Sequence, residues 1–174
     1  MVFDRQGHCL RSWGDGVFTR AHGMPMGPDA TVFCTADGAH TVRTGTLEGK
    51  VLFTLGVPGT PAPCMSGEPF HRCPHVALDP RPGEGSVSAG YGHARVPKET
   101  PDGRGLFAWG EAGTAPGQCN IVHNMATAQE GWVYGAAREK HRMPVCDPQG
   151  TLATQWGHMA RPSGLDSAQA GGRV

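Results

Sequence analysis

The sequence predicts an all-β protein built from a repeated unit of four short strands. Two observations support this prediction: a composition rich in turn-forming residues, and a motif that recurs four times. The 174 residues include 27 glycines and 15 prolines, and so many turn formers leave little room for helices.

The net charge and the hydropathy of the chain argue against some classes of binding partner. Fifteen basic residues balance fifteen acidic ones, and 38% of the residues are apolar. This composition differs from that of a disordered polyelectrolyte and argues against a nucleic-acid-binding surface. No apolar run approaches 18 residues, so we expect no membrane span. Residues 1–5 lack the basic-then-apolar pattern of a signal peptide, and the cellular compartment stays open.

The repeated motif is a glycine followed, six and seven positions later, by an apolar residue and a second glycine. It occurs in residues 7–14, 49–56, 103–110 and 150–157, with Trp13, Leu55, Trp109 and Trp156 as the apolar members. The steps between motifs are 42, 54 and 47 residues. A constant internal offset within a period of this length indicates a repeat architecture.

Strand-like segments recur in phase with the motif. They precede each first glycine, as in residues 2–4, 96–98 and 143–147, and recur at residues 31–33, 86–88 and 132–134. Four short strands in a unit of this size are typical of a β-propeller blade.

This pattern predicts an incomplete β-propeller over residues 1–165. Three complete blades are expected at about 17–56, 68–110 and 117–157, with partial blades at both ends, and residues 166–174 are expected to form a disordered tail. Three blades do not close a ring. We therefore expect either a fragment of a longer protein or a chain that completes the ring by self-association.

The six cysteines, at positions 9, 34, 64, 73, 119 and 146, form no CxxC pair. A zinc ribbon is therefore not expected. We interpret them as buried thiols that act as small apolar residues. Their number also permits three disulfides, so the redox state stays open.

Three histidines hold the same position in successive predicted blades. His22, His75 and His123 each precede the second strand of a unit, and His22 and His123 lie 101 residues apart in alternate blades. Because the first strand of each blade lines the central channel, histidines from alternate blades can converge on one axial metal. We interpret His75, in the intervening blade, as a structural residue.

Four motifs, in order and in phase with the repeat, resemble a known family. They are residues 20–23 (RAHG), 89–95 (AGYGHAR), 121–124 (IVHN) and 136–142 (AAREKHR). The chain resembles the peptidyl-α-hydroxyglycine α-amidating lyases and their bacterial relatives with NHL repeats. The resemblance runs from about residue 2 to 165 and covers the middle half of a six-bladed member.

The resemblance implies zinc ligands at His22 and His123 and catalytic residues at Tyr91 and Arg138. A third histidine ligand is expected near position 220 and a second active-site arginine before Met1, both outside this chain. Structural calcium is also implied. The reaction splits a carbinolamide C–N bond to give a peptide amide and glyoxylate, and full-length relatives are often secreted.

Several positions depart from the family pattern. Ala89 and Ala137 replace aspartates that support turns, and His93 and Lys140 replace asparagines that accept the left-handed conformation. Two aromatic positions hold smaller side chains, at Cys119 and Cys146, and prolines 25, 97 and 144 fall within strand-like segments. These departures predict marginal stability, and they indicate either a shared bulge or damage at the prolines.

Three hypotheses follow for function. The first is a zinc-dependent lyase acting on a peptide or small molecule in the central channel. The second is a non-catalytic NHL propeller that binds a protein or small ligand. The third is a partial product with no independent function.

Overall fold

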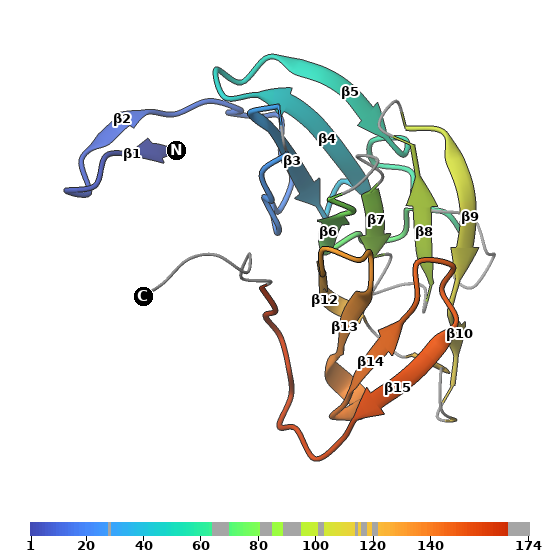
Figure 1. Cartoon of the computed structure of the whole chain (residues 1–174). Coiled ribbons are helices and arrows are strands. Elements are labelled where there is room, and N and C mark those ends of the chain that lie inside the picture. The colour runs from blue at the N-terminus through green and yellow to red at the C-terminus, as the bar shows by residue number, and fades with distance from the viewer. Residues whose placement is uncertain are drawn as a thin grey trace.

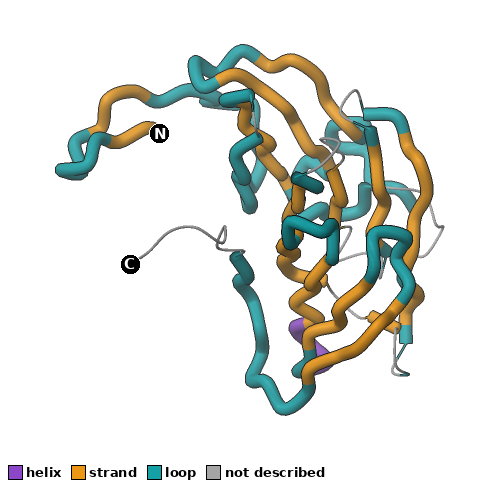
Figure 2. Tube along the Cα trace, in the orientation of Figure 1, coloured by secondary structure: helices purple, strands orange, loops and turns teal. Residues whose placement is uncertain are grey.

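The computed structural model describes residues 1–27, 29–63, 70–80, 85–88, 95–100, 103–113, 115, 118–119 and 122–166. Strands and loops make up nearly all of these residues (Figure 2), apart from one turn of 3₁₀ helix at Arg138–Lys140 (η1). The all-β prediction is confirmed. In the part of the chain described, no helix has the length and apolar character needed to cross a membrane.

Three antiparallel sheets follow one another along the chain, and we call them the first, second and third blades. The first contains β3 (Thr31–Ala36), β4 (Thr41–Thr46) and β5 (Val51–Leu55). The second contains β6 (His75–Leu78), β7 (Gly85–Ser88), β8 (Val96–Glu99) and β9 (Gly105–Trp109). The third contains β12 (Val122–Thr127), β13 (Val133–Ala137), β14 (Met143–Cys146) and β15 (Leu152–Trp156). In each sheet, strands that are consecutive in sequence are hydrogen-bonded neighbours.

The innermost segment of the first blade is less regular than predicted. Residues 21–26 lie along β3 without forming a regular strand, and isolated bridges pair Ala21 with Ala36 and Met26 with Val32. Pro25 lies within this segment, and a proline has no N–H to donate to a strand ladder. Its carbonyl still accepts a hydrogen bond from the Phe33 N–H at 3.0 Å.

The blades lie side by side in an arc (Figure 1). Their first strands face the inside of the arc, and β5, β9 and β15 lie on the outside. A hairpin of β1 (Val2–Phe3) and β2 (Cys9–Arg11) extends away from the sheets at the N-terminal end. A short parallel pair, β10 (Glu111–Ala112) and β11 (Gln118–Cys119), connects the second and third blades.

The apolar core lies between the blades. One cluster, between the first and second blades, contains Val42, Phe70, Cys73 and Val76. A second cluster, between the second and third blades, contains Ala77, Val96, Val122, Met125 and Val133, with Trp109 packed against it. A cavity of about 170 Å³ remains beside this second cluster, and Cys146 and Gly135 are among the residues that line it.

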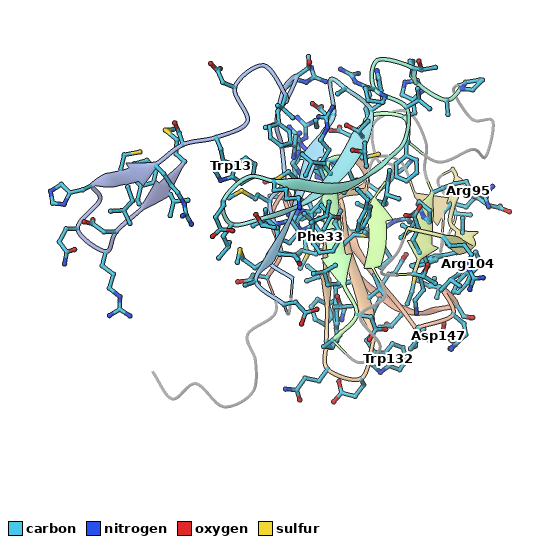
Figure 3. The ribbon with its side chains drawn as sticks, turned by 90° about the horizontal axis from the view of Figure 1, so that it is seen from above. Trp13, Phe33, Arg95, Arg104, Trp132 and Asp147 are labelled. Atoms are coloured by element: carbon cyan, nitrogen blue, oxygen red, sulfur yellow. The ribbon has the colours of Figure 1, made fainter. Side chains whose placement is uncertain are left out.

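The repeated glycine motif is explained by a contact between neighbouring blades. A Cβ atom added to Gly49 would lie 2.5 Å from the Trp13 ring, and one added to Gly103 would lie 2.6 Å from Leu55. Gly150 has the same relationship to the Trp109 ring. Figure 3 shows Trp13 where the chain from the N-terminal hairpin reaches the first blade. Each apolar member of one motif therefore covers the first glycine of the next.

The outer hairpins also repeat in their backbone geometry. The strand pairing shifts register next to Phe3, Gly45, Glu99 and Cys146, which hold the same position in the four repeats. An aspartate or threonine follows each of these residues. Asp147 is one example, and its carboxylate accepts hydrogen bonds from the Gln149 and Thr151 N–H groups at 3.0 and 2.8 Å.

Of the two alternatives for Pro97 and Pro144, a shared bulge or damage, the strand pairing shows the bulge. Pro97 pairs with Ala108 and Pro144 with Gln155, and the register shift follows one or two residues later in each case. The described β7–β8 pairing joins Gly85 to Glu99 and Ser86 to Lys98, so it stops before Pro97. The missing proline N–H is therefore not needed for the ladder.

Two expectations from the sequence are wrong. Cys9 is exposed rather than buried, because the N-terminal hairpin carries it away from the sheets, whereas Cys34 and Cys73 are buried as expected. In the turn after Ala137, the residue with positive φ is His141, at 53°, and not Lys140, which lies within η1. The predicted strain at His93 lies outside the described residues, as does the predicted tail at residues 166–174 apart from Asp166.

Candidate channel site

His22 and His123 face each other at the inner side of the arc. His22 lies in the innermost segment of the first blade, and His123 is the second residue of β12 in the third blade. Their ring centroids are 5.1 Å apart, and the ring planes meet at 67°. The structure therefore brings together the two residues that the sequence assigns as zinc ligands.

The backbone of His22 is held by the neighbouring strand β3. The His22 N–H donates to the Thr35 carbonyl at 2.9 Å, and the Gly23 N–H donates to the Thr35 hydroxyl at 2.6 Å. The same hydroxyl lies 3.0 Å from the Pro74 carbonyl of the second blade. Thr35 is completely buried, and its hydroxyl links the backbone of Gly23, next to His22, to that of Pro74, next to His75.

The ring of His123 is oriented by the segment that follows β15. Its Nδ1 lies 2.9 Å from the Ser163 carbonyl oxygen. A carbonyl can only accept, so Nδ1 carries the proton and the neutral ring has its lone pair on Nε2. The Leu165 N–H also donates to the Asn124 side chain at 3.2 Å, which fastens this segment to the inner strand.

His75 lies beside this pair, although the sequence assigns it a structural role. It is the first residue of β6, in the blade between the other two. Burial, together with the nearby His22 and His123, lowers the pKa of His75 to about 4. A Cβ atom on Gly23 would lie 2.8 Å from Nδ1 of His75, so only a glycine leaves room for this imidazole.

Arg138 and Tyr91 are the two predicted catalytic residues. Arg138 begins η1, directly after the inner hairpin of the third blade, and is half-buried. Burial is the main cause of the lowered pKa of His123, and the charges of His22 and Arg138 contribute to it. Arg138 is therefore close enough to act on His123. Tyr91 and most of its motif, residues 89–94, lie outside the described residues.

The loop that carries His22 is braced by an ion pair that sequence reasoning did not identify. The Arg20 guanidinium binds both carboxylate oxygens of Asp37, at 2.5 and 2.7 Å, and Asp37 is buried. Arg20 has a positive φ of 53°, which turns the chain into the His22 segment. A bidentate pair of this kind fixes geometry as well as charge.

The donor set fits zinc in its chemistry. Zinc accepts neutral imidazole nitrogens, and a ligating histidine commonly donates its other N–H to a carbonyl, as His123 does to Ser163. Two histidines supply part of a coordination shell. Among the described residues, no three His, Cys, Asp or Glu side chains are grouped to hold a metal. The structural calcium that the resemblance implies stays a prediction.

In sequence, the chain is similar to amidating monooxygenases and to an NHL repeat-containing protein. No protein-family model matches it. It is 29% identical over 140 residues to peptidyl-glycine alpha-amidating monooxygenase B of Xenopus laevis, covering 77% of this chain and 16% of that protein. It is 30% identical over 156 residues to NHL repeat-containing protein 3 of Mus musculus, covering 84% and 44%. The chain thus spans less than half the length of these relatives.

Solved structures decide the fold. A streptogramin B lyase structure superposes with a TM-score of 0.60 at 13% identity, over 80% of this chain and 41% of the other. The WD40 repeats of RRP9 superpose with a TM-score of 0.61 at 12% identity, over 85% and 40%. The chain has a β-propeller fold. At these identities the structural likeness establishes the propeller fold alone.

Proposed function

We propose that this propeller supplies His22 and His123 to the zinc site of a peptidyl-α-hydroxyglycine amidating lyase. The observation that carries the proposal is the 5.1 Å separation of two imidazoles that come from inner segments 101 residues apart in sequence. The similarity to amidating monooxygenases over 77% of the chain supports the same assignment. A third ligand would come from outside these 174 residues.

The proposed reaction breaks the C–N bond of a carbinolamide. The hydroxyl proton moves to the departing amide nitrogen, and the hydroxyl carbon becomes the aldehyde carbon of glyoxylate. Bound zinc would polarise the substrate hydroxyl and favour loss of its proton. Tyr91 would carry the proton, and Arg138 would attract the substrate carboxylate.

Zinc titration of the purified chain tests the metal assignment. Calorimetry of wild type, His22→Ala and His123→Ala should show a zinc affinity that falls at least tenfold in each variant. His8→Ala is the matched control, because His8 lies in the N-terminal hairpin with its side chain 78% exposed. Equal affinities in all four proteins would contradict the assignment.

An assay of glyoxylate release tests the lyase activity itself. An N-acyl-α-hydroxyglycine is supplied to the zinc-loaded chain, and the Arg138→Gln variant is measured beside it. We expect release that depends on zinc and is weaker in the variant. Zinc binding without any release from the wild type would reject the lyase and leave a metal-binding propeller.

The second candidate function is a non-catalytic NHL scaffold that binds a protein or small ligand in the channel. NHL repeat-containing protein 3 matches a larger share of the chain than the amidating monooxygenases do, and the described residues hold no complete metal site. Self-association to complete the ring belongs to this proposal. Native mass spectrometry with zinc present would show a metal-free species if the scaffold is correct, and dimers would support self-association.

A further inference from the structure

His75 lies in the channel wall between the inner segment that carries His22 and strand β12, which carries His123. It begins β6, the innermost strand of the second blade, and β6 contacts both β3 and β12. A Cβ atom on Gly23, the residue after His22, would lie 2.8 Å from Nδ1 of the His75 ring. Three consecutive inner segments therefore contribute one imidazole each to the same region.

The ring of His75 has a hydrogen-bonding capacity that the described residues do not use. No hydrogen bond to either ring nitrogen occurs within the part of the chain described. A neutral imidazole carries one N–H donor and one lone pair. Half-buried polar groups of this kind normally find a partner, so the channel offers a donor to a molecule that enters it.

The arrangement also argues against a third metal ligand at this position. His22 and His123 belong to alternate blades, whereas His75 belongs to the blade between them. The three rings do not form a group able to hold a metal. We therefore consider a contact between His75 and a part of the substrate that lies away from the metal.

We propose that His75 is a positioning residue that donates a hydrogen bond to a carboxylate oxygen of a glycine-derived ligand held beside His22 and His123. This inference rests on the proposed function. If the substrate hydroxyl lies at the metal, its carboxylate needs donors elsewhere in the channel. His75 offers an N–H, and Arg138, near His123, offers positive charge.

The test measures binding of N-benzoylglycine, which has the carboxylate and amide but no hydroxyl and cannot react. His75→Leu removes the donor, and His75→Gln keeps one. We expect the Leu variant to bind at least tenfold more weakly, as for a hydrogen bond to a charged group. The Gln variant should stay within about threefold of wild type. His71→Gln is the matched control, a half-buried histidine that hydrogen-bonds the Ala62 carbonyl.

Zinc affinity and NMR separate this inference from the proposed function. Zinc affinity should be the same in wild type, His75→Leu and His75→Gln, and the imidazole resonances of His75 should shift when N-benzoylglycine is added. Unchanged ligand affinity in His75→Leu, or equal losses in the Leu and Gln variants, would overturn the inference. A loss of zinc affinity in His75→Leu would show a metal ligand instead. Failure of the proposed function appears separately, as zinc affinity that is insensitive to His22→Ala and His123→Ala.

Discussion

The indole of Trp109 lies against Gly150 of the following blade, where no other residue type would fit. Gly150 has a φ of 85°, and a Cβ atom placed on it would overlap the indole ring. Two requirements therefore act on this glycine: a backbone conformation that L-residues avoid and a surface flat enough to hold an aromatic ring. Both are met again where Trp13 covers Gly49.

Gly150→Ala should destabilise the propeller more than Gly7→Ala. Gly7 has nearly the same φ, 88°, but an added Cβ would meet nothing within 4 Å. Gly7→Ala should therefore cost only the left-handed strain of about 1–2 kcal/mol, whereas Gly150→Ala also displaces Trp109. Urea unfolding of the two variants measures the difference, and equal losses would mean that the indole contact contributes nothing.

Thr35→Val should destabilise the protein by about 1–3 kcal/mol, because it leaves the half-buried Gly23 N–H without the Thr35 hydroxyl as acceptor. Thr44→Val is the matched control. Thr44 is also buried in the first blade, but its hydroxyl has no hydrogen-bond partner among the described residues. Its replacement should be neutral or stabilising. Thermal unfolding of both variants measures the two changes in stability. A larger loss of stability for Thr44→Val than for Thr35→Val would contradict the prediction.

Glu99 should make stability fall as the pH rises. Burial raises the pKa of its carboxyl from 4.5 to about 7, and within the described part of the chain its Oε2 atom has no hydrogen-bond partner. Below pH 4.5 the carboxyl is protonated in both the folded and unfolded states. Between pH 4.5 and 7 the unfolded chain ionises first, so the free energy of unfolding decreases.

Glu99→Gln should remove this loss. The variant should gain on the order of 2 kcal/mol over wild type at pH 8, and little at pH 5. Denaturant unfolding at the two pH values measures the gain. Glu48→Gln, at a side chain that is 70% exposed, serves as the control. A gain for Glu99→Gln that is equal at both pH values would show that ionisation is not the cause.

Cys146→Phe should stabilise the protein by filling the cavity between the second and third blades. The sister repeat has Phe3 at this position, and the cavity volume of about 170 Å³ exceeds the added volume. We expect a gain of about 1–2 kcal/mol in the free energy of unfolding. Cys146→Ser, which keeps the size but is more polar, should give no gain. A lower melting temperature for the Phe variant would show that the cavity cannot admit a ring.

The repeat could be predicted from the sequence because the glycine motif marks a contact that recurs between blades. The offset from Gly103 to Trp109 is fixed by the length of β9, and the covering of Gly150 by Trp109 repeats that of Gly49 by Trp13. The irregular inner segment of the first blade was less predictable. The pairing of this segment depends on the backbone geometry between Pro25 and β3. The spacing of residues in the repeat carries no information about that geometry.

The site was predictable in part. The phase of the repeat placed His22 and His123 on inner strands, and the structure brings their rings together. The same phase marked His75, but the family pattern assigned it no role, and its proximity to the other two depends on Gly23. The burial of the Glu99 carboxyl was not predicted. Glu99 directly follows a predicted strand, and this position in the sequence does not indicate whether its side chain is buried.

The covering of each glycine by a ring or leucine from the preceding repeat gives the array a direction. If one blade opens, its first glycine moves away and leaves the ring or leucine of the preceding blade exposed. The ring or leucine of the opened blade itself loses only its contact with the glycine of the following blade. Trp156, the last of the series, is 49% exposed. Local opening should therefore spread unequally along the chain, toward the N-terminus more readily than toward the C-terminus. In a linear array of this kind, the order in which the blades unfold depends on which neighbouring blade each one covers.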